Sequence, residues 1–272
     1  MQQDQAKKLA DDSLAALITA LEAGQSNALK NYLTTMSKFH RYSWGNVLLI
    51  SAQKPSATHV AGFRMWQKLN RHVKKGEKGI VILAPMVIRK KAHGEDTEDN
   101  ETRLFGFRAA HVFDISQTEG EPLPEFASVK GDPESHLLRL KEAIRSKGIV
   151  LEYTSEIYPA LGCSTGGRIQ VLPFMSAAGE FSVLAHEFAH ELLHRGQRRT
   201  QTTKTVRETE AEAVAFVVCQ AINLDTNTAA SDYIQLYQGD KDTLTESLEF
   251  IQHTAAEIIT AITEEVREEL VA

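Results

Sequence analysis

The sequence VLAHEFAHELLH at residues 183–194 limits the fold and chemistry of this 272-residue chain more than any other stretch. Its apolar residues recur with the spacing of one helix face, which predicts an amphipathic helix over residues 179–195. Residues four apart project from the same side of a helix, so His186 and His190 can reach one metal ion while Glu187 stands beside it. The stretch therefore predicts a helix that carries a metal site over a packed core.

The imidazole nitrogens of this pair suit zinc. A catalytic Zn2+ ion usually has three protein ligands and keeps a fourth position for water. The ion makes that water more acidic, so Glu187 could serve as the general base of a hydrolytic reaction. The alternative interpretation is a core or surface set of histidines that binds no metal.

The histidine pattern overlaps itself, because His190 and His194 are also four residues apart. A helix rises about 12 Å over eight residues, so His186 and His194 cannot bind the same ion. We prefer His186 and His190 as the chelating pair, in part because of the resemblance described below. His194 is then expected at the surface or behind the ligands.

A third ligand is expected from the acidic segment RETEAEAVAF at residues 207–216. Glu208 and Glu212 are four apart and share a helix face, whereas Glu210 is about 200° around the helix from Glu208. We therefore predict Glu208 as the third metal ligand and Glu212 as the carboxylate that orients a ligand imidazole. The alanines of this segment would let its helix approach the histidine helix closely. A solvated acidic turn is the alternative.

The chain around this site has an α+β pattern. The expected elements are a helix near 135–146, strands at 149–153 and 168–172, a glycine-rich bend at 162–167, and helices at 179–195, 205–223 and 243–269. Residues 135–272 are assigned to one domain with a small sheet and several helices. Glycines and prolines crowd residues 120–133 without a periodic apolar face, so residues 121–134 are predicted to be a linker.

Residues 1–120 are predicted to form a second domain of mixed α and β structure. The expected helices lie at residues 4–23, at about 28–50 with a possible break at Gly45, and at 65–69. A turn at 76–79, a buried strand at 80–83, a polar loop at 92–102 and a β segment at 103–115 complete this half.

Charge is divided unevenly along the chain, whose net charge is −6. Residues 27–94 hold 13 Lys and Arg against the single acid Glu77, which gives +12 and leaves −18 for the rest. Aromatic residues lie among these bases, a mixture that favours single-stranded nucleic acid because nucleobases stack on rings while lysines follow the phosphates. A solvated basic face, with both tryptophans in the core, is the alternative. The candidate DNA-binding residues are Lys38, Arg41, Tyr42, Trp44, Arg64, Trp66, Lys68, Arg71, Lys74, Lys75 and Lys78.

Four motifs follow one another in this half: YSWGNVLLI at 42–50, QKPSAT at 53–58, KKGEKGI at 74–80 and FDISQT at 113–118. In this order they resemble the ArdC-type antirestriction proteins. The resemblance implies a single-stranded-DNA-binding domain joined to a C-terminal, zincin-like metallopeptidase domain, in proteins that plasmids, phages and other mobile elements carry to protect incoming DNA. Residues 208–212 also resemble the glutamate-ligand zinc peptidases, many of which have aspartate where this chain has Glu212.

Two functions follow as hypotheses. In the first, the protein binds single-stranded DNA non-specifically and protects incoming mobile-element DNA. In the second, it is a zinc-dependent protease that its N-terminal domain delivers to DNA-associated proteins, with residues 168–172 as an edge strand that aligns a peptide. The sequence does not decide whether the chain is an enzyme.

Other features of the sequence argue against secretion and membrane insertion. Cys163 and Cys219 give no disulfide framework, and the N-terminus lacks the apolar core of a signal peptide. No apolar run approaches the roughly 18 residues that span a bilayer. We therefore expect a cytosolic protein of a bacterial cell, or of a recipient cell into which it is transferred.

Overall fold

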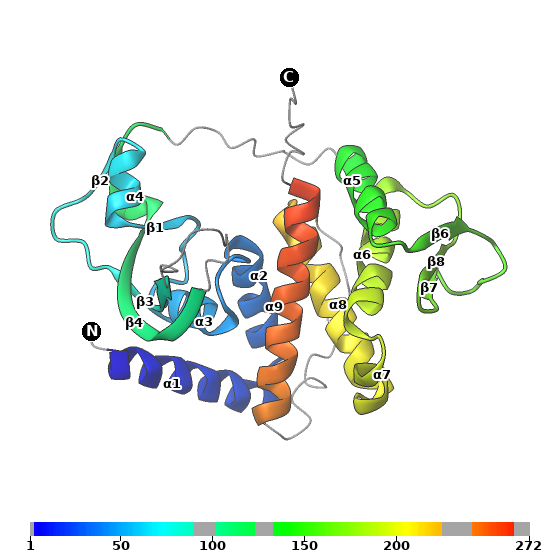
Figure 1. The fold of residues 1–272 in the computed structure, drawn as a ribbon, viewed down its shortest axis with the longest axis horizontal. Coiled ribbons are helices and arrows are strands. Elements are labelled where there is room, and N and C mark those ends of the chain that lie inside the picture. Colours follow the sequence, from blue (N-terminus) through cyan, green and yellow to red (C-terminus); the bar gives the residue numbers. More distant parts are fainter. Residues whose placement is uncertain (1–2, 90–101, 123–132, 225–240, 264–272) are drawn as a thin grey trace, which may run out of the picture. The chain divides into compact units, whose positions relative to one another are not determined.

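The computed structural model of the chain describes residues 3–89, 102–122, 133–224 and 241–263 (Figure 1). Contacts group the chain into two units, Met1–Ala16 with Gly45–Pro124 and Leu17–Trp44 with Glu125–Ala272. Helices combine with small sheets, as the α+β pattern predicted. The sequence did not indicate that Leu17–Trp44 would join the second unit, and the domain limits at 120 and 134 stay predictions.

The strands of the first unit form two small antiparallel sheets. One has the order β1-β4-β3, from β1 (Val60–Gly62), β4 (Thr102–Asp114) and β3 (Ile80–Arg89). The other pairs β2 (Arg71–Val73) with β5 (Thr118–Gly120). The sequence predicted β3 and β4 but not the three-residue strands, which are too short to show a period. Residues 92–101 of the loop predicted at 92–102 and most of the predicted linker lie outside the described residues, and Thr102 begins β4.

The helices near the N-terminus follow the predicted pattern with one correction. They are α1 (Gln3–Glu22), α2 (Ser26–Lys38), α3 (Trp44–Gln53) and α4 (Phe63–Lys68), and the 3-10 helix η1 (Ile115–Gln117) follows β4. The single helix expected at 28–50 is wrong, because α2 ends before α3 begins. At the C-terminal end of α2, the Phe39 N–H donates to the carbonyls of Met36 and Thr35. The helix therefore ends before Gly45.

Two side chains of α3 form hydrogen bonds with the backbone groups on the edge of β3 that no strand pairs with in the described residues. Gln53 bonds to both the N–H and the carbonyl of Val81, and Asn46 bonds to both groups of Leu83, at 2.8–3.0 Å. The next position on this edge is Pro85, which has no N–H to offer. Unpaired backbone groups on a strand edge can form hydrogen bonds with a strand of another chain. The two amides and the proline leave fewer such groups on the edge of β3. The YSWGN and QKPSAT motifs thus contribute structural residues.

Asp114 organises the end of β4. Its side chain accepts hydrogen bonds from the N–H groups of Thr58, His59 and Ser116, and Gln117 bonds back to its N–H. Burial opposes ionisation of Asp114, but these hydrogen bonds outweigh it and lower its pKa. The FDISQT motif is therefore a capping box for η1.

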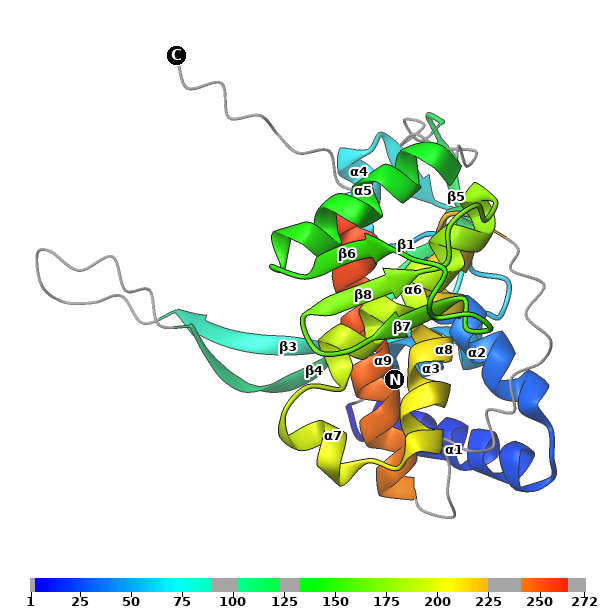
Figure 2. The ribbon, with the colours of Figure 1, turned by 90° about the vertical axis from the view of Figure 1, so that its right-hand side faces the viewer.

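The second unit contains a three-stranded sheet and several helices (Figure 2). Its central strand β8 (Arg168–Val171) pairs in parallel with β6 (Val150–Tyr153) and antiparallel with β7 (Gly162–Ser164). The helices besides α2 are α5 (Pro133–Ser146), α6 (Ala177–Leu193), α7 (Gln197–Gln201), α8 (Lys204–Ala221) and α9 (Lys241–Thr263). The bend predicted at 162–167 thus contains the strand β7.

Helix α6 is central to this unit. It contacts β7 and β8 and also packs against α5, α8 and α9 (Figures 1 and 2). Phe181, Leu184 and Phe188 lie on its fully buried side. Burial of each such side chain contributes roughly 1.5–3 kcal/mol, so the helix is held firmly in place. Within the described ranges, no helix combines the length and apolar character needed to span a membrane.

Candidate metal centre

The histidine helix α6 spans Ala177–Leu193, so it begins and ends two residues before the predicted limits of 179 and 195. The Ser176 hydroxyl accepts a hydrogen bond from the Gly179 N–H at 3.2 Å and so caps the N-terminus. With the apolar side of the helix buried, His186 and His190 lie one turn apart on another side, and their ring centroids are 4.7 Å apart. Local helix geometry is thus enough to pair them.

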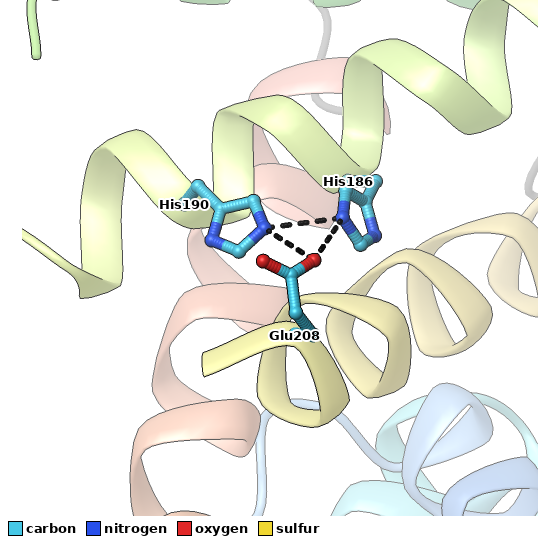
Figure 3. Close-up of side chains that lie close together, drawn as sticks. All are labelled: His186, His190 and Glu208. Atoms are coloured by element: carbon cyan, nitrogen blue, oxygen red, sulfur yellow. Dashed lines mark hydrogen bonds and ion pairs between the residues drawn. The ribbon is translucent and has the colours of Figure 1, made fainter. Parts of the chain in front are cut away.

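Helix α8 supplies the third group. Thr203 caps its N-terminus, and buried alanines on α8 let it pack against α6. Figure 3 shows Glu208 projecting from α8 toward the two imidazoles. Its Oε2 lies 3.6 Å from His186 Nε2 and 3.4 Å from His190 Nε2, and the two nitrogens are 3.1 Å apart. The structure therefore brings together the three predicted ligands.

These three distances fit one metal ion. Zinc–ligand bonds of about 2.0–2.2 Å in tetrahedral geometry place neighbouring donor atoms roughly 3.3–3.6 Å apart. The observed separations of 3.1–3.6 Å are close to that range. With three ligands from the protein, a tetrahedral ion would keep a fourth position for water. The donors also suit other divalent ions, because imidazole and carboxylate bind several of them.

Glu212 and His194 lie behind the ligands. Glu212 Oε2 is 3.4 Å from His186 Nδ1, which is where an orienting carboxylate was predicted. His194 Nδ1 is 2.9 Å from His190 Nδ1, and its Nε2 contacts Glu210. Because His194 is buried and contacts Glu210, whereas His186, His190 and Glu208 lie together, the geometry favours His186 and His190 as the chelating pair.

The three predicted ligand side chains differ in pKa, and therefore in which of them carries a proton. Burial opposes protonation of His186, but hydrogen bonds with Glu208 and Glu212 outweigh it and raise its pKa to about 9. Burial and the charge of His186 lower the pKa of His190 to about 4. The hydrogen bond from His186 lowers the pKa of Glu208 to about 2, although burial opposes its ionisation. Without metal, His186 therefore carries the proton at neutral pH.

Metal affinity is expected to rise with pH because binding must displace the His186 proton. Below its pKa of about 9, the association constant should rise roughly tenfold per pH unit, and it should level off above this pKa. Competition with a chromophoric chelator of known proton affinity, repeated from about pH 6 to about pH 8, measures the slope. A constant affinity over this range would show that His186 does not hold the proton.

Glu187 follows the predicted ligand His186 on α6, and its side chain lies beside strand β7. It is 8% exposed. Burial raises its pKa, partly opposed by the charge of His186 and a hydrogen bond with Ser164. A raised pKa makes a carboxylate a stronger base, which suits the predicted role.

The edge of the sheet beside Glu187 is β7, which corrects one prediction. Residues 168–172 were expected to form an edge strand, but β8 is central because β6 and β7 pair with its two sides. Gly162 of β7 approaches α6 so closely that an added Cβ would lie 2.6 Å from Val183 Cγ1 and 2.8 Å from Glu187 Oε1.

Replacing Gly162 with alanine is expected to destabilise the protein by about 2 kcal/mol, the usual range for overpacking. Thermal and urea unfolding of the two proteins measure the difference. Gly45→Ala is the matched control, because an added Cβ there meets no atom within 4 Å. If both variants were equally stable, close packing between β7 and α6 would not be the reason for glycine at 162.

The predicted DNA-binding residues differ in exposure. The exposed ones are Lys38, Arg41, Arg64, Lys68, Lys74, Lys75 and Lys78, whereas Tyr42 and Trp44 are partly buried. The structure corrects the prediction for Trp66 and Arg71. Trp66 is 2% exposed and donates to the Phe113 carbonyl, and Arg71 donates to Thr118 and to the Gly120 carbonyl. Both side chains join segments of the first unit.

Sequence reasoning missed two aromatic side chains of β4. Phe105 is 75% exposed and Phe107 is 42% exposed, and Arg108 beside them is also exposed. The signal was present as LFGFR at residues 104–108, which again places aromatic residues next to a base. On its own, the pattern predicts only β structure.

The sequence is similar to a known protein family and to two bacterial proteins. The family model for the N-terminal domain of anti-restriction factor ArdC matches residues 7–113. Uncharacterized proteins of Bacillus anthracis and Sinorhizobium fredii are 26% and 27% identical over 86% and 76% of this chain. The chain spans 47% of the length of the first and 75% of the second.

Solved structures of the antirestriction protein ArdC from the R388 plasmid share the fold. The metal-free form has a TM-score of 0.56 at 22% identity, with 93% of this chain and 97% of that chain covered. The Mn(II)-bound form has a TM-score of 0.55 at 21% identity, with coverages of 95% and 99%. A relative with this fold therefore binds a divalent metal.

Proposed function

We propose that this chain, whose residues 7–113 match the family model for the N-terminal domain of anti-restriction factor ArdC, is an ArdC-type antirestriction protein. In this proposal it binds single-stranded DNA non-specifically and protects incoming mobile-element DNA. The observation that carries the proposal is the basic turn between β2 and β3. Lys74, Lys75 and Lys78 are exposed there, around a glycine, Gly76, with φ +90°.

The charge of this turn is well suited to a polyanion. Glu77 is its only acid, and the Glu77 carboxylate accepts a hydrogen bond from Gln117 at 2.8 Å. The Lys74 ammonium donates to the Ser116 carbonyl at 3.0 Å, which fixes its position while leaving it exposed. Phosphate groups of a nucleic acid would pair with such cations and release counterions, which gives affinity without sequence preference.

The double variant Lys75→Ala/Lys78→Ala is expected to weaken single-strand binding roughly tenfold at low salt. Loss of two phosphate contacts should reduce the slope of log affinity against log salt by about 1.4, since each contact contributes about 0.7. Fluorescence anisotropy of a labelled oligonucleotide with the full-length chain, over a series of salt concentrations, measures both quantities.

Lys147→Ala is the control, because Lys147 is a similarly exposed lysine of the second unit that pairs with Glu257 at 2.5 Å. Wild-type protein that fails to bind single strands in a salt-dependent way would overturn the proposed function. A double variant that matches the control would remove the turn from the DNA-binding surface. Unlabelled duplex of the same length, used as a competitor, tests the preference for single strands.

The second unit is proposed to bind a zinc ion through His186, His190 and Glu208, in a zincin-like domain. The fit of their donor atoms to a tetrahedral ion supports this, as does the Mn(II) ion of the R388 relative. A divalent ion would supply Lewis acidity and a water of lowered pKa. Metal analysis of protein purified without added metal, followed by competition between Zn2+ and Mn2+, identifies the preferred ion.

A zinc-dependent protease that acts on DNA-associated proteins is the second candidate function. It is favoured by the position of Glu187, whose charge interacts with those of His186 and Glu208 and whose side chain lies beside the edge strand β7. An extended peptide that added to β7 would pass close to this carboxylate. Glu187 would then accept a proton from the attacking water and return it to the leaving amine.

A further inference from the structure

Behind the ligand His190 lies a buried polar chain that neither proposed function uses. The side chains of His194 and Glu210 are 0% exposed. His190 Nδ1 is 2.9 Å from His194 Nδ1, and His194 Nε2 is 2.9 Å from Glu210 Oε2. Such groups are costly to bury unless each hydrogen bond is made, so their arrangement is specific.

The other oxygen of Glu210 receives two donors. Arg198 Nη2 and Ser247 Oγ each lie 2.6 Å from Glu210 Oε1. The Arg198 guanidinium also lies 3.5 Å from the centre of the Phe250 ring. Since Arg198 belongs to α7 and Ser247 to α9, the buried Glu210 carboxylate of α8 joins these helices to His194, the residue that follows the last turn of α6.

The contacts of Glu210 determine which nitrogens carry protons. A carboxylate at 2.9 Å requires a hydrogen on His194 Nε2, because a lone pair there would face the oxygen directly. With its hydrogen on Nε2, His194 has a lone pair on Nδ1, which can accept the hydrogen of His190 Nδ1 at 2.9 Å. The remaining nitrogen, His190 Nε2, is left with a lone pair that can accept the hydrogen of His186 Nε2, 3.1 Å away.

We propose that Glu210 and His194 form a relay that holds His190 in the tautomer and orientation required for metal binding, with α7 and α9 as its anchor. Both are positioning residues, since they act through His190. The relay differs from the contact between Glu212 and His186, because it reaches its ligand through a second imidazole. The inference rests on the metal centre proposed above.

Metal affinity of the full-length chain tests the relay. His194→Phe keeps a ring but removes both nitrogens, and Glu210→Gln keeps the shape but removes the charge. Each is expected to lower Zn2+ affinity about 10–100-fold, the effect usual for residues that orient a ligand. Chelator competition measures it, and circular dichroism shows whether each variant is folded. The matched control is Glu246→Gln, because Glu246 also contacts Arg198 but is not part of the relay.

The Zn2+ affinity of the wild-type protein separates failure of the metal centre from failure of the relay. Wild-type protein without specific Zn2+ binding would overturn the metal centre itself, whereas variants that bind as tightly as wild type would overturn the relay alone. The histidine tautomers of the metal-free wild-type protein test the relay even if a variant fails to fold. Long-range 1H–15N NMR spectra should show hydrogen on Nδ1 of His190 and on Nε2 of His194, and the reverse tautomer at either residue would contradict the relay.

Discussion

Replacing Glu208 with alanine is expected to lower affinity for a divalent metal ion by at least about a hundredfold while the protein stays folded. Residues that only orient a ligand affect affinity about 10–100-fold, so loss of a ligand should exceed that range. The Glu208 side chain is 52% exposed, so its removal leaves no buried cavity. Chelator competition and metal content after dialysis measure the change, and thermal unfolding without metal checks the fold.

A second effect should accompany the loss of metal. Glu208 is the first of the groups that raise the pKa of His186 to about 9, so this pKa should fall in the variant. NMR titration of the metal-free protein follows it. Glu249→Ala, which removes an exposed carboxylate of α9, is the control for net charge. Full metal affinity in Glu208→Ala would exclude Glu208 as a ligand.

The candidate site could be predicted from sequence because its information is local. Two histidines four apart must share a helix face, and the same spacing relates Glu208 to Glu212. Because these residues lie on only two helices, packing of α6 against α8 is enough to complete the site. The role of His194 could not be predicted, because it depends on Glu210, Arg198 and Ser247 from three other helices. No spacing in the sequence relates these groups.

The fold was predicted best where elements are long and worst where they are short. The periodic apolar pattern located α6, α8 and α9, whereas strands of three residues such as β1, β2 and β7 have no measurable period. The association of Leu17–Trp44 with the second unit depends on packing between α2 and α8, which is distant in sequence. Tertiary contacts of this kind lie beyond a local pattern.

Residue type alone was an unreliable guide to the DNA-binding surface. Trp66 and Arg71 have the chemistry expected of a nucleic-acid contact, yet both are buried and bonded to backbone carbonyls. A tryptophan N–H or a guanidinium can satisfy carbonyls inside a small domain as readily as it can bind DNA. The exposed lysines around Gly76 are therefore stronger candidates for DNA contact than Trp66 and Arg71.

The Glu187→Gln variant is expected to bind metal nearly as tightly as wild type and to lose at least about a hundredfold of any peptide hydrolysis. Glutamine keeps the size of the side chain but cannot accept the proton of an attacking water, and a general base typically contributes 10²–10⁴-fold. Because Glu187 is not one of the three grouped ligands, the ion should remain. Hydrolysis of fluorescein-labelled casein, with and without single-stranded DNA, measures turnover, and chelator competition measures metal.

The same variant separates the two functions when protection of unmodified plasmid DNA is measured in a restricting recipient. Glu180→Gln is the control on the same helix, since Glu180 bonds to Tyr153 and Lys141 rather than to the ligands. If Glu187→Gln protects DNA as well as this control and wild type, antirestriction depends on DNA binding without hydrolysis. If it binds DNA and metal normally but no longer protects, proteolysis is part of the function, and β7 becomes the surface on which to seek its substrate.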